Sequence, residues 1–336
     1  MSRSYVNPVY GGYLGDPFVW RHEGVWYAVG SGAPEAKLAV EELRFRAARA
    51  GQQTRLFPML RSEDFVTWHA AGAALVPPDP ALGDYFSAPE VAVADGRFYL
   101  YYSAGRMNQV HQLRVAVSDR PLGPYEDTGE QLVDPFACYF SNDPHPFRDD
   151  DGRWYLFYTR DLVDAPPGWR IGGTLVADRL LNMTTLAGEE TVVLRPRFDW
   201  QRFDPDRWRY GLRWDWHLLE GPFVRKHAGR YWCFYSGGDW ETERYGVDYA
   251  VADAPLGPYD DTGGDQGPRV LASVPGQLLG PGHNSVVTGP DGATDYLAYH
   301  AWDPWLRDRR LCLDRLRWTE HGPRCDGPTW TAQSID

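Results

Sequence analysis

Cysteine is scarce in this 336-residue sequence, which contains only Cys138, Cys233, Cys312 and Cys325. These cysteines lie far apart and form no CxxC pair, so the sequence does not indicate a zinc site. Cys233 and Cys312 stand within apolar strand patterns and are expected to be small buried hydrophobic residues. A chain of this length buries well over half of its unfolded surface, so it needs no disulfides to be stable.

Long apolar runs are also lacking. No run of about 18 apolar residues occurs, so no membrane-spanning helix is predicted. The first ten residues, MSRSYVNPVY, lack the apolar core of a secretory signal, and we therefore expect a cytoplasmic protein. Positive charge is in deficit, with 34 Lys and Arg against 46 Asp and Glu and a net charge of −12. Nucleic acid and anionic membranes are unfavourable partners for such a chain, because both are polyanions.

Aromatic residues and turn formers, in contrast, are abundant. The sequence contains 15 Trp, 20 Tyr and 14 Phe together with 35 Gly and 27 Pro. This composition is typical of short strands joined by tight turns. The aromatic rings either fill a large β core or stack on the apolar faces of sugars, and composition leaves both uses open.

An internal repeat predicts the architecture. Residues 114–129 (RVAVSDRPLGPYEDTG) and 248–263 (DYAVADAPLGPYDDTG) are identical at 11 of 16 positions, at an offset of 134. A third aromatic segment between them, DDDGRWYLFYTRD from Asp149, divides this offset into two units of about 67 residues, so the chain holds five units. Each unit has a glycine-containing hairpin, a strongly aromatic strand and a Pro/Gly turn, as in a four-stranded antiparallel blade. We therefore predict an all-β, five-bladed β-propeller that forms a single domain over residues 1–336.

One segment breaks the repeat. Residues 34–50 are rich in Ala, Glu, Leu and Arg, and their pattern predicts a short amphipathic helix inserted in the first blade. Three roles are open for it: a wall of the active site, a subunit contact or a plain surface helix. Nothing else in the sequence indicates an oligomeric state.

The hairpin glycines locate one residue in each unit that starts its innermost strand. Counting back eight residues in the first unit and nine in the others gives Asp16, Ser87, Asp143, Glu220 and His283. In a propeller these positions meet at one mouth of the central channel. Three carboxylates held together repel one another, which raises at least one pKa and does not favour stability. A protonated carboxylic acid facing an ionised one is the equipment for glycoside hydrolysis, whereas turn capping and a structural cation are the alternatives.

At these residues the chain resembles glycoside hydrolase family 43. The motifs that carry the resemblance are NPV at Asn7, GDPF at Gly15, NDPHPFRDDDG from Asn142, LEGPF from Leu219 and GPGHNSVV from Gly280. Each motif is short, but their order and their distribution over the units match the family along essentially the whole chain. The resemblance implies a five-bladed propeller, an inverting mechanism and no required cofactor.

The resemblance also implies a role for each carboxylate. Asp16 would be the general base that activates a water, and Glu220 the general acid that protonates the leaving oxygen. Asp143 would hold Glu220 in position and raise its pKa. Inversion requires the base and the acid to stand about 6.5–9.5 Å apart, so that a water fits between them.

Two supporting residues follow from the same resemblance. His283 matches a histidine near the channel axis that helps to hold a calcium ion or an ordered water, and a hydrogen-bonded core histidine is the alternative. Arg309 matches an arginine that contacts the sugar and the acidic pair. Its neighbour Arg310 leaves this register open by one residue, and a solvated charge in the RDRR run is the alternative.

The second unit departs from the family pattern. Where the family has a sugar-stacking Trp before Ala-Pro, this sequence has Ser87, and Phe86 or Tyr85 is expected to take over the contact with substrate. Glu90, which ends this motif, is interpreted as structural.

The segment between Asp199 and Trp216 contains four tryptophans and precedes Glu220. We interpret it as a long ordered loop that narrows the groove into a pocket, with packing between blades as the alternative use of its tryptophans. A pocket favours exo cleavage.

The function predicted is therefore an inverting exo-acting glycoside hydrolase that removes terminal α-L-arabinofuranosyl residues from oligosaccharides of plant polysaccharides such as hemicellulose. A β-D-xylosidase of the same family is the first alternative. A retaining fructan hydrolase is a weaker one, because such enzymes carry Asn-Asp-Pro-Asn and Glu-Cys where this chain has Gly-Asp-Pro and Glu-Gly. An inactive propeller that only binds glycans or protein partners is the alternative from another class.

Overall fold

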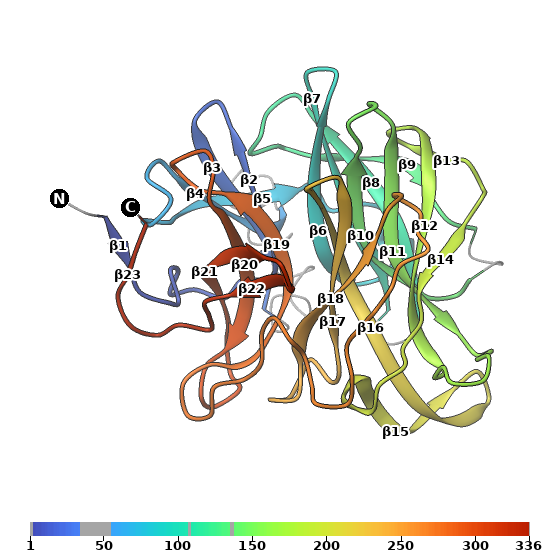
Figure 1. Ribbon diagram of the computed structural model, residues 1–336. Helices are drawn as coiled ribbons and strands as arrows, with labels where there is room; N and C mark the ends of the chain where they lie inside the picture. The colour runs from blue at the N-terminus through green and yellow to red at the C-terminus, as the bar shows by residue number, and fades with distance from the viewer. Residues whose placement is uncertain (1–2, 34–54, 107–108, 135–137, 336) are drawn as a thin grey trace.

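The computed structural model describes residues 3–33, 55–106, 109–134 and 138–335 (Figure 1). The helix predicted at residues 34–50 lies outside these ranges. Within them the helical elements are two 3₁₀ turns, η1 (Pro80–Leu82) and η2 (Asp199–Gln201). Neither has the length or apolar character of a membrane-crossing helix. The regular structure is otherwise made of strands, so the all-β prediction is confirmed.

Three sheets have four antiparallel strands in sequential order. The first contains β2 (Gly15–His22), β3 (Val25–Ser31), β4 (Leu56–Ser62) and β5 (His69–Leu75). The second contains β6 (Tyr85–Ala94), β7 (Arg97–Arg106), β8 (Val110–Ser118) and β9 (Glu126–Gln131). The third contains β19 (Leu279–Thr288), β20 (Asp295–Trp302), β21 (Arg309–Thr319) and β22 (Gly322–Cys325).

The remaining large sheet has nine strands in two antiparallel groups. One group contains β10 (Ser141–Arg148), β11 (Trp154–Leu162) and β12 (Gly172–Asn182), with the short β13 (Thr185–Leu186) and β14 (Thr191–Leu194) on β12. The other contains β15 (Arg202–Arg209), β16 (Leu212–His227), β17 (Arg230–Gly237) and β18 (Gly246–Ala252). The groups meet where Gly172 and Gly173 of β12 pair in parallel with the middle of β16.

The ends of the described chain are joined by a two-stranded pairing. β1 (Ser4–Tyr5) runs antiparallel to β23 (Gln333–Ser334), and the two lie side by side at the left of Figure 1.

The sequence repeat is also a structural repeat. Its two best-matched copies begin in β8 and β18, which are both followed by the same Pro/Gly turn. In each copy the turn tyrosine donates its hydroxyl to a proline carbonyl four residues earlier at 2.9 Å, Tyr125 to Pro121 and Tyr259 to Pro255. Repeated antiparallel sheets of this kind fit a β-propeller.

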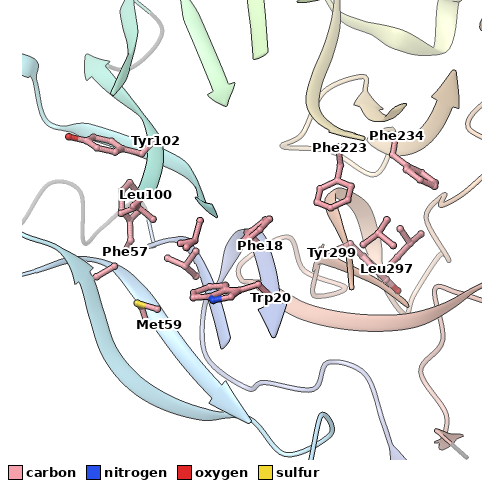
Figure 2. Packing of buried hydrophobic residues seen from close by; sticks show 14 of the residues in the cluster. Phe18, Trp20, Phe57, Met59, Leu100, Tyr102, Phe223, Phe234, Leu297 and Tyr299 are labelled. Atoms are coloured by element: carbon pink, nitrogen blue, oxygen red, sulfur yellow. The ribbon is translucent and has the colours of Figure 1, made fainter. Parts of the chain in front are cut away.

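The core is apolar and extends between sheets. In Figure 2, Phe18 and Trp20 of β2 lie between a group from the second and first sheets and a group from β16, β17 and β20. The ring centroids of Phe18 and Phe223 are 6.4 Å apart, which joins β2 to β16. Each fully buried side chain of this size contributes about 1.5–3 kcal/mol to folding. The core thus holds in place the inner strands whose first residues form the site.

Candidate active site

Each innermost strand carries one residue with a left-handed backbone near its start. These residues are Asp16 (φ 48°), Ala88 (φ 48°), Asp143 (φ 58°), Gly221 (φ 56°) and His283 (φ 49°). Each lies where the pairing of the strand with its neighbour shifts by a bulge. Bulges re-aim side chains and are frequent next to active sites. Left-handed φ costs a non-glycine residue conformational energy, which the surrounding structure must offset.

Counting back from the hairpin glycines identifies the left-handed residue in three of the five units. It is off by one in two units, because Ser87 and Glu220 precede the left-handed residue rather than occupying it. Hairpin length explains the difference. The hairpins after β2, β6 and β16 have two residues, whereas those after β10 and β19 are longer, so one count cannot serve all units.

A side chain of the neighbouring sheet anchors most of these strained residues. The backbone N–H donates to a hydroxyl or an imidazole on the second strand of that sheet: Ala88 to Ser31 Oγ (3.0 Å), Asp143 to Ser103 Oγ (2.9 Å), His283 to Ser236 Oγ (2.8 Å) and Asp16 to His300 Nδ1 (3.1 Å). Gly221 is the exception, because its N–H donates to the carboxylate of Asp143 at 3.1 Å. Asp143 is thereby tied to the backbone next to Glu220.

The predicted carboxylates share one pocket. Asp16, Asp143 and Glu220 line it together with His283 and Arg309. The five side chains come from β2, β10, β16, β19 and β21. The structure therefore brings together residues that the sequence separates by almost 300 positions.

Asp16 is surrounded by groups that favour its ionised form. Arg309 donates Nη1 to Asp16 Oδ1 at 2.7 Å, and Ser31 Oγ donates to Asp16 Oδ2. Burial alone would raise the pKa of Asp16, but Arg309, followed by His283, His300 and Ser31, lowers it well below its usual range. Asp16 is therefore an ionised carboxylate at neutral pH.

Asp143 and Glu220 are in the opposite situation. Burial raises the pKa of each to about 7, and the negative charge of Asp16 adds to the shift of both. Tyr245 donates its hydroxyl to Glu220 Oε1 at 2.7 Å, which offsets part of the shift of Glu220. Because the two carboxyls are close and buried, they titrate as a coupled pair. The same pocket thus holds a carboxyl pair with raised pKa values and one carboxyl with a lowered pKa.

The open register at Arg309 is resolved by the structure. Arg309 is 4% exposed and also donates Nε to the hydroxyl of Tyr13 at 2.9 Å. Arg310 points elsewhere and pairs with Asp308 at 3.0 Å. Arg309 is therefore the arginine that faces the carboxylates.

His283 lies between two of the acids. Its Nδ1 is 3.6 Å from Asp16 Oδ1 and 3.9 Å from Asp143 Oδ2. In the described ranges no three His, Cys, Asp or Glu side chains gather in a way that suits a metal ion. Calcium prefers six to eight oxygen ligands, which this imidazole with two carboxylates does not supply. Calcium at His283 stays a prediction.

Phe86, which was expected to contact the substrate, does not line the pocket. Phe86 is buried in the apolar core, whereas its neighbour Tyr85 lines the pocket, because successive side chains of a strand point to opposite faces. Ser87 also lines the pocket. Glu90 is buried in a 2.7 Å contact between its Oε2 and His145 Nδ1, which agrees with a structural role.

The segment between Asp199 and Trp216 is a hairpin rather than the expected loop. It forms η2, β15 and the first part of β16. Trp216 is buried and lines the pocket, but Trp200 stacks on Tyr235 and Trp208 is 64% exposed. The predicted narrowing of the site thus depends on one of the four tryptophans.

Ser31, Tyr245 and Trp240 are among the contributors to the site that were not identified from the sequence. Ser31 follows the aromatic and apolar run of its unit's second strand, as Ser103 and Ser236 do in the repeats YYSAG and FYSGG, so aligning the repeats could have found it. Trp240 lines the pocket, and the guanidinium carbon of Arg309 lies 4.8 Å from the centroid of its ring. No repeat or motif points to Trp240 or Tyr245.

Comparison with known proteins agrees with this geometry. The sequence profile of Glycosyl hydrolases family 43 matches residues 5–323. A β-D-galactofuranosidase of Aspergillus niger is 30% identical over 72% of this chain and 62% of its own length. An extracellular exo-α-(1→5)-L-arabinofuranosidase of Streptomyces avermitilis is 26% identical over 98% of this chain and 65% of its own length. The chain thus spans less than two thirds of each of these relatives.

Solved structures add the fold. A thermostable family-43 glycoside hydrolase superposes with a TM-score of 0.79 at 29% identity, covering 98% of both chains. An α-L-arabinofuranosidase from Lactobacillus brevis superposes with a TM-score of 0.71 at 20% identity, covering 97% of this chain and 98% of that one, and shares the fold. With a family profile that spans nearly its whole length, the chain belongs to glycoside hydrolase family 43.

Proposed function

We propose that this protein is an inverting, exo-acting glycoside hydrolase that removes terminal α-L-arabinofuranosyl residues from oligosaccharides of plant polysaccharides. The observation that carries the proposal is the contrast within one pocket: Asp16 has a lowered pKa, whereas Asp143 and Glu220 have raised ones. Carboxyl groups of one site whose pKa values are shifted in opposite directions indicate a general acid and a general base.

In the proposed reaction Asp16 is the general base. It takes a proton from a water as the water oxygen attacks the anomeric carbon. Glu220 gives its proton to the leaving oxygen as the glycosidic bond breaks, and the anomeric configuration inverts. Asp143 positions Glu220 through the N–H of Gly221 and keeps the pair protonated.

The choice of arabinofuranose is supported by the Streptomyces avermitilis relative, whose name states that sugar and exo action. A β-xylosidase of Xylanibacter ruminicola is 28% identical over 65% of this chain and 67% of its own length, and it supports the alternative of a β-D-xylosidase. Exo action also agrees with the β15–β16 hairpin, which contributes Trp216 to the pocket lining.

We further propose that the chain is one domain with five blades. The two antiparallel groups of the nine-stranded sheet would then be two blades that share the two parallel pairs between β12 and β16. The five left-handed residues, one for each inner strand, support this count.

Hydrolysis of 4-nitrophenyl α-L-arabinofuranoside, 4-nitrophenyl β-D-xyloside and the corresponding oligosaccharides tests the proposal. The wild type should release sugar from one series, and proton NMR of the first product should show the inverted anomer. Glu220→Ala should lose turnover of the oligosaccharides. If no substrate is cleaved and Asp16→Asn binds glycans as the wild type does, the protein is a binding module instead.

A further inference from the structure

Arg207 differs from the other arginine of the pocket in having no acidic partner. Arg309 is paired with Asp16, and Arg209, next to Arg207 on β15, is paired with Asp161 at 2.7 Å. Arg207 lines the same pocket, yet in the described part of the chain it makes no ion pair with a carboxylate. The pocket therefore contains a cation that, among the described residues, no carboxylate holds in a close ion pair.

Two aromatic rings hold this guanidinium. Its central carbon lies 4.6 Å from the ring centroid of Phe203 and 5.3 Å from that of Trp216, and both rings line the pocket. A guanidinium that stacks through its face keeps its in-plane N–H groups free for a planar partner such as a carboxylate. The arrangement therefore orients Arg207 without using its hydrogen-bonding edge.

The position is electrostatically unfavourable for the protein alone. Burial, followed by repulsion from Arg209, lowers the pKa of Arg207, and the negative charges of Asp161, Asp204 and Glu220 offset only part of this shift. A half-buried cation beside another cation does not stabilise the fold through its charge. A role in binding explains its placement better than a role in stability.

The charge of Arg207 acts on the acid side of the pocket. Arg207 lies on β15, which pairs with β16, the strand that carries Glu220. Tyr245, Arg309 and then Arg207 lower the pKa of Glu220, whereas Arg207 is not among the groups that shift the pKa of Asp16. In the proposed function Glu220 protonates the leaving oxygen, so the sugar on its side of the broken bond is the leaving group.

We propose that Arg207 binds a carboxylate on the leaving-group sugar, so that the substrate is an oligosaccharide in which the terminal sugar is attached to a uronic-acid residue. This inference rests on the proposed function. A planar carboxylate can accept two parallel N–H bonds from the guanidinium, which is the strongest pairing available to it. Because the protein carries a net charge of −12, an anionic substrate needs such a local cation to be held.

Binding of matched sugars tests the inference without turnover. Methyl galacturonoside and methyl galactoside differ at C6 by a carboxylate against a hydroxymethyl group, and methyl glucuronoside and methyl glucoside form a second such pair. By titration calorimetry the wild type should bind one uronoside about tenfold more tightly than its neutral partner, with a preference that weakens as salt is added. The pair that shows the preference identifies the uronic acid.

Three variants test whether Arg207 is the source of the binding preference for the uronoside. Arg207→Gln should abolish the preference, and Arg207→Lys should keep part of it because the charge remains. Arg213→Gln, on the same hairpin but paired with Asp206 at 2.7 Å, should behave as the wild type does. Equal binding of charged and neutral sugars by the wild type would overturn the inference.

Turnover separates this inference from the proposed function. Arabinofuranosyl and xylosyl disaccharides on the uronic acid that shows the binding preference, and on its neutral partner, should show the same tenfold preference in kcat/KM, lost in Arg207→Gln. Cleavage of both without a preference contradicts the anion site and leaves the glycosidase intact. Binding preference without cleavage of either contradicts the glycosidase and leaves the anion site intact.

Discussion

The two sides of the pocket treat the same functional group in opposite ways. On the β2 side, Asp16 accepts hydrogen bonds from Arg309 and Ser31. On the β10 and β16 side the donors are neutral: the N–H of Gly221 donates to Asp143, and the hydroxyl of Tyr245 donates to Glu220. The groups around Asp16, with Arg309 the largest contributor, thus lower its pKa while burial raises the pKa of the other two carboxyls.

The largest effects are expected when the proposed base, Asp16, and the proposed acid, Glu220, are replaced one at a time. Asp16→Asn should lower kcat by about 10³-fold or more for every leaving group, because water still needs a base. Glu220→Gln should lower kcat to a similar extent only for sugar leaving groups and much less for 2,4-dinitrophenol, which departs without a proton. Steady-state kinetics on both kinds of glycoside measures this, and equal losses in the two variants for both leaving groups would remove the distinction between the sides.

Removing the guanidinium of Arg309 should reduce the difference in protonation between the two sides of the pocket. Arg309→Met leaves the buried Asp16 without its partner, which should cost about 3 kcal/mol or more in the free energy of unfolding near neutral pH. The pKa of Asp16 is lowered by folding, so this contribution is present above the ordinary aspartate pKa and is lost as pH falls below it. Denaturant unfolding of the wild type and Arg309→Met should therefore show the largest difference in the free energy of unfolding above about pH 4. Arg310→Met serves as the control. A gap that is the same at all pH values would mean that Arg309 acts through packing alone.

The alkaline limb of activity should respond in opposite directions to two changes on the acid side. Wild-type kcat/KM should fall as pH rises through about 7, because the Asp143–Glu220 pair then loses the proton needed by the leaving group. Tyr245→Phe removes a hydrogen bond to ionised Glu220 and should move this limb to higher pH. Asp143→Asn removes a like charge and should move it to lower pH. Shifts of the same sign in the pH–rate profiles would contradict the assignment.

The smallest effect is expected at the hydroxyls that anchor the strained residues. Ser31→Ala should cost about 1 kcal/mol of stability and raise the pKa of Asp16, so that the acidic limb of activity moves to higher pH. The hydroxyl of Ser103 accepts the N–H of Asp143. Ser103→Ala should therefore cost a similar amount of stability without moving the acidic limb of activity. Thermal unfolding and pH–rate profiles distinguish the two variants, and identical profiles would show that Ser31 has no electrostatic role.

The repeat carried most of what the sequence could predict about the fold. The 134-residue offset, the hairpin glycines and the short motifs led to an all-β chain of repeated sheets and to Asp16, Asp143 and Glu220 in one pocket. These features are local in sequence and recur in each unit, so they can be recognised without coordinates.

The errors arose where the answer depends on side-chain direction or long-range packing. Phe86 and Tyr85 are equally aromatic, and only the register of β6 decides which one reaches the pocket. The off-by-one count at Glu220 came from hairpin lengths that glycine spacing does not reveal. Tyr245 comes to Glu220 from another part of the chain, and no local pattern marks such a contact.

The central claim is that Asp16 is ionised while the Asp143–Glu220 pair holds a proton near neutral pH. It is tested most directly by following carboxyl ¹³C resonances in aspartate- and glutamate-labelled protein during a pH titration, assigned with Asp16→Asn, Asp143→Asn and Glu220→Gln. The pair should titrate near pH 7, and Asp16 should stay ionised down to about pH 4. Titration of all three carboxyls near pH 4, or of Asp16 near pH 7, would contradict it.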